Sequence, residues 1–373
     1  MAQWKTTWAQ AHADMSMLCK GIKDYTARIT VFSEFDGDQL RVRLSNQEGL
    51  APAVLEGVSV MIGNEKPAPL SFEGENALTL QPGECIYSDP IAILLHAGDA
   101  VTVSLAFKGA ATSGNNLPDC IRVSTKGNFT QSRQMPTAKP NLLAKLNGVD
   151  PVLPILSAIE VHSKEEKEVL VCFGDSITQM SRWSKPLADQ LRYTGKETVV
   201  INKGIAGNQL LSDPMIKMMS MYGTAAIKRF EEDVLRVQGA TAVLFALGVN
   251  DMNMVKDEKA LQGKAEAAMS ALEELAAKAK ARGMKTYLAT VTPCGGCKGY
   301  RVFTNPEREK LNKLIRESTS FDGVVDFDAV VRDPENPGVL QEICDSGDHL
   351  HPGAAGGQLM AKAAYHMLTG KDD

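Results

Sequence analysis

A serine in this chain follows an apolar segment in a way that could serve nucleophilic chemistry. Ser176 comes two residues after Gly174, which ends the apolar run 169–173, and a helix-compatible segment, residues 183–191, begins shortly afterwards. A hydroxyl between a strand end and a helix start is placed to act as a nucleophile. Taken alone this pattern is not specific. Acyl transfer would also need an imidazole base, an orienting carboxylate and donors for an oxyanion.

Two of the six histidines lie close to carboxylates near the C-terminus. Asp348 and His351 have an i,i+3 spacing, which lets the carboxylate reach one ring nitrogen while the other faces a substrate. Asp345 and His349 form an i,i+4 alternative. The other four histidines lie outside such motifs. The residues by themselves leave both pairs open as base and orienting acid.

Oxyanion donors are available in two further motifs. Gly207 lies in the segment 202–208, and Asn250 lies in the segment 248–251. Glycine permits close approach of a backbone N–H, and an Asn amide presents two N–H donors. The N–H groups of Ser176 and Gly207 and the side chain of Asn250 are therefore the candidate donors.

Alternating strands and helices must bring these motifs together. We predict strands at residues 169–174, 198–202, 242–247, 286–291 and 324–327, with helices at 224–237, 258–282, 306–318 and 354–368 between or after them. This alternation is typical of a mostly parallel sheet covered by helices on both faces. Because each polar motif follows a strand or precedes the last helix, the motifs should converge at one edge of the sheet.

The first part of the chain is predicted to be a β-sandwich. Short strands separated by Pro and Gly are expected at 26–33, 39–45, 54–62, 77–80, 85–87, 91–95 and 101–107, with further strands near 121–124 and 151–161. The turn 36–38 predicts a hairpin between the first two of them. A charged connector at 164–168 marks the boundary, so we predict an accessory domain at 1–163 and a catalytic domain at 164–373.

The four motifs, in this order, resemble the conserved blocks of the SGNH hydrolases, also called the GDSL esterases and lipases. Residues 174–177, 207, 248–251 and 348–351 carry the resemblance, and the last block favours His351 over His349. The resemblance implies a flavodoxin-like three-layer fold without metal or cofactor. It makes Ser176 the nucleophile, His351 the general base and acid, and Asp348 the orienting carboxylate. Ser176, Gly207 and Asn250 would form the oxyanion hole. Residues 41–46 resemble more loosely the β-rich region that precedes the catalytic domain in a bacterial subgroup.

This resemblance implies a serine esterase that acts on a short acyl group, with acetyl on a carbohydrate as the first expectation. A lipase or lysophospholipase is the alternative ester hydrolase. A glycan-binding protein on an inactive hydrolase scaffold is the alternative outside enzymes. The expected partner is a small-molecule or oligosaccharide ester.

Composition bounds the remaining classes of function. The net charge of −5 argues against a nucleic-acid binder, which would need a basic face. No apolar run approaches the roughly 20 residues of a membrane span. Seven scattered cysteines do not indicate a disulfide framework, and the N-terminus lacks the pattern of a signal peptide. A cytoplasmic location is expected, unless a leader was removed.

Four other motifs have a structural interpretation, alone or beside a functional one. The pair Cys294 and Cys297 is read as part of a loop near the substrate pocket, and the acidic residues at 251–258 as helix caps rather than a calcium loop. Trp183 is expected to pack its helix on the sheet or to stack on a sugar ring. Methionines at 215–221, 252 and 254 would line an acyl pocket or fill core.

Overall fold

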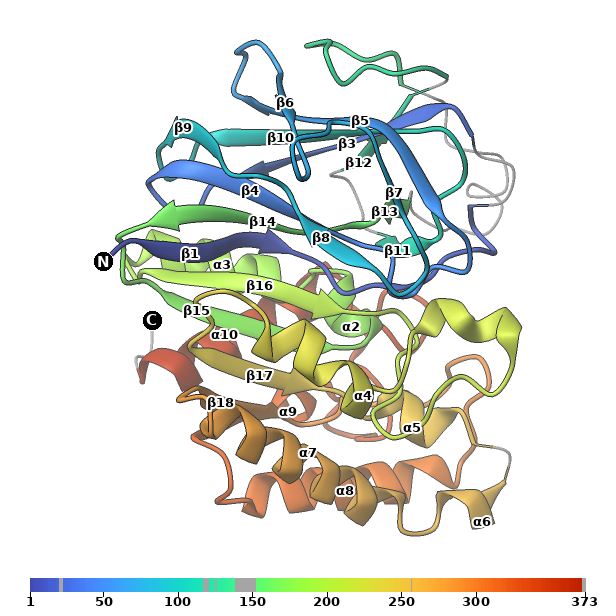
Figure 1. Cartoon of the computed structure of the whole chain (residues 1–373). Helices are drawn as coiled ribbons and strands as arrows, with labels where there is room; N and C mark the ends of the chain where they lie inside the picture. The colour runs from blue at the N-terminus through green and yellow to red at the C-terminus, as the bar shows by residue number, and fades with distance from the viewer. Residues whose placement is uncertain (20–22, 117–120, 125, 138–151, 256, 371–373) are drawn as a thin grey trace. The chain divides into compact units, whose positions relative to one another are not determined.

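The computed structural model describes residues 1–19, 23–116, 121–124, 126–137, 152–255 and 257–370 (Figure 1). The chain divides into two compact units. Unit 1 contains residues 1–166 and 216–223, and unit 2 contains residues 167–215 and 224–373. The accessory and catalytic roles predicted for the two parts stay predictions.

Unit 1 consists of antiparallel sheets, as the short alternating strands predict. Its described strands form one five-stranded, one six-stranded and one three-stranded sheet. The five-stranded sheet contains β1 (Gln3–Ala9), β14 (Leu156–Ser163), β4 (Gly37–Ser45), β8 (Cys85–Tyr87) and β9 (Ile91–Leu95). The six-stranded sheet contains β12 (Ile121–Val123), β3 (Tyr25–Phe32), β10 (Ala100–Phe107), β5 (Ala53–Ile62), β6 (Ala68–Leu70) and β7 (Leu78–Leu80). The small sheet contains β13 (Val152–Pro154), β11 (Ser113–Asn116) and β2 (Ala13–Asp14).

The predicted hairpin between β3 and β4 is wrong. β3 pairs with β10 and β12, whereas β4 pairs with β14, β8 and β9, so the two strands belong to different sheets. Phe35 in their connection is fully buried. The connection thus crosses from one sheet to the other and contributes an apolar side chain to the core. The strand expected at 151–161 is also interrupted, at Ile155 with its positive φ of 52°.

Unit 2 has the parallel sheet that the sequence predicts. Its strand order is β16 (Thr198–Gly204), β15 (Glu168–Gly174), β17 (Ala242–Ala246), β18 (Lys285–Ala289) and β19 (Gly323–Val325). All four pairings are parallel. This is the flavodoxin-like order, in which the first strand lies between the second and third. The carboxyl ends of β15, β16 and β17 therefore lie side by side.

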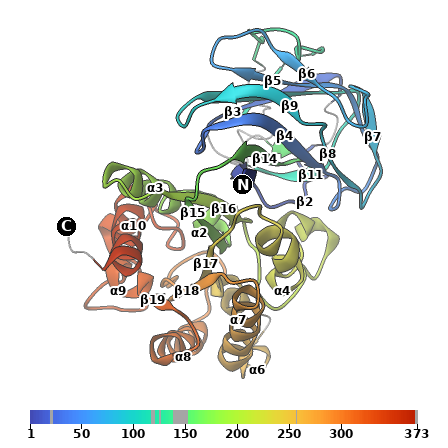
Figure 2. The same cartoon turned by 60° about the vertical axis from the view of Figure 1, so that its left-hand side comes forward.

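Helices cover both faces of this sheet (Figure 2). The described helices of unit 2 with four residues or more are α2 (Ser176–Gln179), α3 (Ser184–Tyr193), α4 (Ala226–Phe230), α5 (Val249–Asn253), α6 (Glu258–Leu261), α7 (Lys264–Lys280), α8 (Thr304–Glu317), α9 (Phe327–Val331) and α10 (Ala354–Thr369), with a π-helical turn η2 (Glu231–Leu235) after α4. Alternate residues of β15 face opposite layers. Leu170 and Cys172 join a core with residues of α3, α9 and α10, whereas Phe173 packs edge-on against Phe230 of α4.

Two predicted helices are interrupted. The helix expected at 258–282 is split between α6 and α7, because Gly263 has a φ of 75° and begins a new helix. The helix expected at 224–237 begins at Ala226 and ends in η2. Within the described ranges, the structure contains no helix that is both long and apolar enough to cross a membrane.

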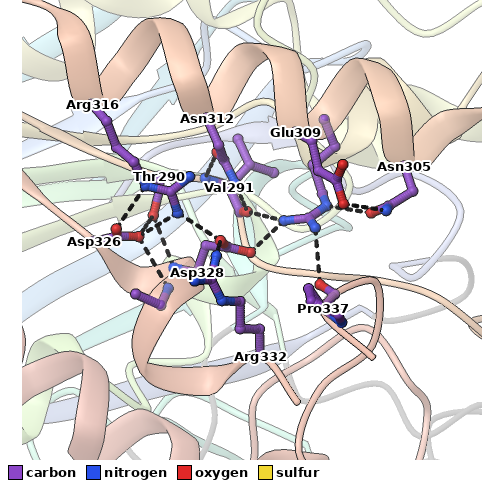
Figure 3. A network of polar contacts seen from close by, with 12 residues as sticks. Thr290, Val291, Asn305, Glu309, Asn312, Arg316, Asp326, Asp328, Arg332 and Pro337 are labelled. Carbon is purple, nitrogen blue, oxygen red and sulfur yellow. Dashed lines mark hydrogen bonds and ion pairs between the residues drawn. The ribbon is translucent and has the colours of Figure 1, made fainter. Parts of the chain in front are cut away.

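A buried ionic network fixes the end of β18 to α8 and α9 (Figure 3). The carboxylate of Asp328 accepts hydrogen bonds from Arg308 at 2.5 Å, Arg316 at 2.7 Å and Arg332 at 2.9 Å. Arg308 also donates to the carbonyl of Val291, just beyond β18. The network therefore joins segments that are far apart in the sequence at the edge of the sheet where the polar motifs gather.

Candidate active site

Ser176 lies at the turn from β15 into α2. Asp175 is the N-cap of this short helix, and its side chain accepts a hydrogen bond from the N–H of Ile177 at 3.0 Å. Ser176 is 5% exposed. As the first residue of α2, it has a backbone N–H without an intrahelical acceptor. A Cβ on Gly204 would lie 2.2 Å from the nitrogen of Gln179, so only glycine lets β16 approach α2 this closely.

His351 and Asp348 complete a chain of hydrogen bonds with Ser176. Nε2 of His351 lies 2.8 Å from Oγ of Ser176, and its Nδ1 lies 2.6 Å from Oδ2 of Asp348. A carboxylate can only accept, so Nδ1 donates a hydrogen bond to Asp348 and Nε2 can accept the hydroxyl proton. This is the arrangement in which an imidazole activates a serine hydroxyl.

The Asp345 and His349 pair also forms, but its hydrogen bonds stabilise the turn that precedes His351. Nδ1 of His349 lies 2.5 Å from Oδ2 of Asp345, while Oδ1 of Asp345 accepts from the N–H groups of Gly347 and His349. His349 has a φ of 62°, which is uncommon outside glycine and directs the chain toward His351. The structure thus brings His351, the histidine that the resemblance favours, to Ser176.

Hydrogen bonding keeps Asp348 ionised. Partial burial by itself raises the pKa of the Asp348 carboxyl. The N–H groups of His351 and Leu350 and the ring of His351 outweigh that effect and hold the pKa well below its usual range. A permanent negative charge beside Nδ1 would stabilise the imidazolium formed when His351 takes a proton.

The candidate oxyanion donors come from adjacent strand ends. Gly207 has a φ of 71° in the turn after β16, which glycine adopts without strain. Asn250 is 4% exposed on α5, after β17, and one of its amide hydrogens is donated to the carbonyl of Asn208 at 3.0 Å. Asp251 accepts from the N–H groups of Leu210 and Leu211 at 2.7 and 2.9 Å. Both contacts join α5 to the loop that carries Gly207.

Two buried carboxyl groups, those of Asp175 and Asp251, directly adjoin Ser176 and Asn250 in the chain. Burial raises the pKa of Asp175 to about 7, and the nearby Asp251 adds to this effect. Burial also raises the pKa of Asp251, although its two backbone donors act in the opposite direction. Asp175 and Asp251 are 2% and 0% exposed, so water has little access to either carboxyl.

Sequence reasoning missed the groups that hold this framework. The side chain of Arg229 on α4 donates to Asn208 and to the carbonyls of Gly174 and Lys203, and it pairs with Asp233. The available signal was the i,i+4 Arg and Asp pair inside an otherwise amphipathic helical segment. A charged pair that a helix buries usually has a structural or functional reason.

The remaining motifs have structural environments. Cys294 and Cys297 are buried free thiols in a turn, where a Cβ on Gly296 would lie 3.5 Å from the ring of His349. Asp257 caps α6 by accepting from Ala260, as predicted. Trp183 is fully buried against Phe327, which settles its role as core packing.

The methionines differ in burial and in the unit to which they belong. Met252 is buried, Met215 is 65% exposed, and residues 219 and 221 belong to unit 1. No group of three or more His, Cys, Asp or Glu side chains within the described parts of the chain is arranged to hold a metal ion.

Comparisons with known proteins found one matching family model and several similar solved structures. Residues 172–359, about half of the 373-residue chain, match the model of the GDSL-like Lipase/Acylhydrolase family. No curated protein matches the chain. Among solved structures, a GDSL-like lipase from Bacteroides thetaiotaomicron is 20% identical over 53% of this chain and 85% of its own, with a TM-score of 0.40. A variant acetyl xylan esterase from Geobacillus stearothermophilus is 20% identical over 55% of this chain and 96% of its own, with a TM-score of 0.41.

Proposed function

The chain belongs to the GDSL-like lipase/acylhydrolase family, and from this premise we propose that it hydrolyses short acyl esters through an acyl-Ser176 intermediate. Members of this family are carboxylic ester hydrolases, so the reaction class follows from the family. The residue roles and the substrate are the proposal. The observation that carries them is the hydrogen-bonded chain from Ser176 through His351 to Asp348.

In the first half-reaction, Oγ of Ser176 attacks the ester carbonyl carbon while its proton passes to Nε2 of His351. The carbonyl oxygen becomes an oxyanion, which the N–H groups of Ser176 and Gly207 and the amide of Asn250 stabilise. The C–O bond to the alcohol then breaks, and the alcohol leaves with the proton from His351. The Asp348 carboxylate holds the ring in place and offsets its transient positive charge.

In the second half-reaction, water replaces the alcohol. His351 takes a proton from water as its oxygen attacks the acyl carbon, and a second oxyanion forms in the same hole. Collapse of this intermediate breaks the bond to Ser176, whose Oγ recovers the proton from His351. The products are the free acid and the unmodified enzyme.

The two neighbours of Ser176 in the chain line a small cavity. Asp175 and Ile177, on either side of Ser176, line a mostly apolar cavity of about 20 Å³ together with Val249, Val291 and Met360. A space of this size holds about one water molecule or a group of similar size. We propose acetyl as the acyl group, because chains that join a β-sandwich to this kind of hydrolase domain resemble carbohydrate esterases.

The proposed alcohol is a sugar hydroxyl of a small or oligomeric carbohydrate. This part of the proposal rests on a resemblance. Chains that join a β-sandwich to this kind of hydrolase domain are similar to carbohydrate esterases. A cytoplasmic location is proposed from the scattered cysteines of the sequence.

Ester hydrolysis by the full chain tests the proposal. We expect nitrophenyl acetate to be cleaved with a higher kcat/KM than the octanoate or laurate, and acetylated xylo-oligosaccharides to release acetate. Ser176→Ala should remove this turnover. A preference for long acyl chains would contradict the acetyl assignment and favour a lipase. Absence of turnover on every ester would contradict the esterase and favour the glycan-binding alternative.

A further inference from the structure

One guanidinium group lies beneath the candidate oxyanion hole. Arg229 is 6% exposed, and its planar face lies over the ring of Phe173, with Cζ 4.2 Å from the ring centroid. The carboxylate of Asp233, one helical turn later, accepts from it at 2.8 Å and lies 3.5 Å from Nζ of Lys203. The carboxylate of Asp233 therefore partly balances the positive charges of Arg229 and Lys203. Both charges lie within unit 2, at a position from which water is largely excluded.

Further hydrogen bonds of Arg229 reach two strand ends and a turn. One terminal nitrogen donates to the carbonyl of Gly174 at 2.8 Å, and the other donates to the carbonyl of Lys203 at 3.1 Å. Nε donates to the side-chain oxygen of Asn208 at 2.9 Å. A single rigid group thus connects the end of β15, the end of β16 and the turn that follows β16.

Two of these attachment points lie close to a candidate oxyanion donor. Gly174 lies two residues before Ser176, and Asn208 directly follows Gly207. The carbonyl of Asn208 accepts the amide of Asn250, which brings the third donor into the same assembly. Any change in the position of Asn208 would therefore displace both Gly207 and the amide of Asn250.

We infer that Arg229 is a positioning residue that sets the spacing of the three oxyanion donors. This inference rests on the proposed function, because it assigns Arg229 a part in stabilising the same oxyanion. The planar guanidinium group, with its several N–H donors, is essential to this role. A lysine would keep the charge opposite Asp233 but could not donate to the separate acceptors that the guanidinium reaches.

Replacing Arg229 should slow the chemical step of the reaction. Oxyanion donors act more strongly on the transition state than on the bound ester, so displacing them lowers kcat and leaves KM nearly unchanged. A displacement of about 1 Å can reduce a rate by about 100-fold. We therefore expect Arg229→Lys and Arg229→Met to lower kcat on nitrophenyl acetate by about 10- to 100-fold.

Arg28 provides a matched control in unit 1. Arg28 is also buried, at 8% exposure, and its guanidinium donates to Ser104 Oγ and to the carbonyls of Phe129, Ser132 and Arg133. Arg28→Lys removes a comparable fork from the other unit, so we expect it to lower the thermal stability while kcat stays within about twofold of wild type. Equal kcat values for wild type and Arg229→Lys, or an equal loss in both arginine variants, would overturn the inference.

Asn208→Ala decides the case if the Arg229 variants do not fold. It removes the acceptor of Nε but keeps the Arg229 and Asp233 ion pair, and we expect a lower kcat with an unchanged KM. A wild-type kcat in this variant would also overturn the inference. Absence of turnover in the wild type would instead contradict the proposed function itself, so the two failures are distinguishable.

Discussion

Asn250 is the residue whose contribution to the reaction rate is easiest to measure separately, because only its side-chain amide is proposed to act. It is buried on α5 and uses one amide hydrogen to bind Asn208, which fixes the direction of the second. We predict that Asn250→Ala lowers kcat about 100- to 1,000-fold, the cost of losing one oxyanion donor. Steady-state kinetics on an acetyl ester measure this effect. A variant that raises only KM would show that Asn250 binds substrate instead.

Asp175 allows a prediction about pH. Its pKa rises from 3.8 in the unfolded chain to about 7 in the fold. Between these values the folded state binds the proton more strongly than the unfolded state, so stability falls as the pH rises from about 4 to about 7. By about pH 8 this group should cost on the order of 4 kcal/mol of unfolding free energy.

Asp175→Asn should remove that dependence, because the amide oxygen can still cap α2 and carries no charge. Urea unfolding of both proteins from pH 4 to pH 8 measures the difference in unfolding free energy. We expect the variant to gain stability relative to wild type as the pH rises. A difference that stays constant over this range would show that Asp175 is not protonated more strongly in the folded chain.

Individual residues of the site could be found in the sequence when their partners are close along the chain. Asp348 and His351 are three residues apart, and Ser176 follows a recognisable strand. Arg229 could not be found in this way, because it binds the main-chain carbonyls of Gly174 and Lys203, which have no residue-specific signature. Only the three-dimensional fold brings these acceptors to one guanidinium.

At the scale of elements, the buried network around Asp328 connects α8 and α9 to the end of β18. Removing the charge of Asp328 leaves the buried guanidinium of Arg308 without a charged partner, which typically costs about 3–5 kcal/mol. We predict that Asp328→Asn lowers the unfolding free energy of unit 2 by that amount. Thermal unfolding followed by calorimetry tests the prediction.

The isosteric exchange keeps the volume of the side chain, so lost packing would not explain a large effect. Glu266→Gln is a matched control, because Glu266 is an exposed carboxylate paired with a single Lys310 on the same unit. An exposed pair of this kind contributes about 0–1 kcal/mol. Equal small effects of both variants would contradict the role we give to the network.

The same scale shows what local patterns can and cannot predict. Strand and helix periods gave the parallel sheet of unit 2, because buried strands and amphipathic helices differ in their spacing. The turn at 36–38 predicted a hairpin, yet turn chemistry specifies only a change of direction and cannot select the partner strand. Gly263 in the segment 258–282 divides a helix that its apolar periodicity alone would continue.

At the scale of the whole molecule, the chain enters unit 1 twice. Residues 216–223 belong to unit 1 although the flanking segments belong to unit 2. Within unit 1, Oγ of Ser220 donates to the carboxylate of Asp14 at 2.8 Å. The sequence could not reveal this, because the segment has no strand pattern and follows directly from the loop after β16.

We therefore predict that residues 164–373 produced alone are less well protected than the same residues in the full chain. In the isolated fragment, Ser220 has lost Asp14, so residues 216–223 should be cleaved first by a protease of broad specificity. Limited proteolysis with mass spectrometry of the fragments compares the two proteins. Equal cleavage rates in this segment would show that unit 1 does not protect it.

The central claim is that Ser176 is the nucleophile activated by His351. Its most direct test is labelling of the full chain with a fluorophosphonate, followed by intact mass measurement and peptide mapping. We predict one label per chain, attached to Ser176, and no label in Ser176→Ala or His351→Ala. A wild-type protein that takes no label, or takes it at another residue, would contradict the claim.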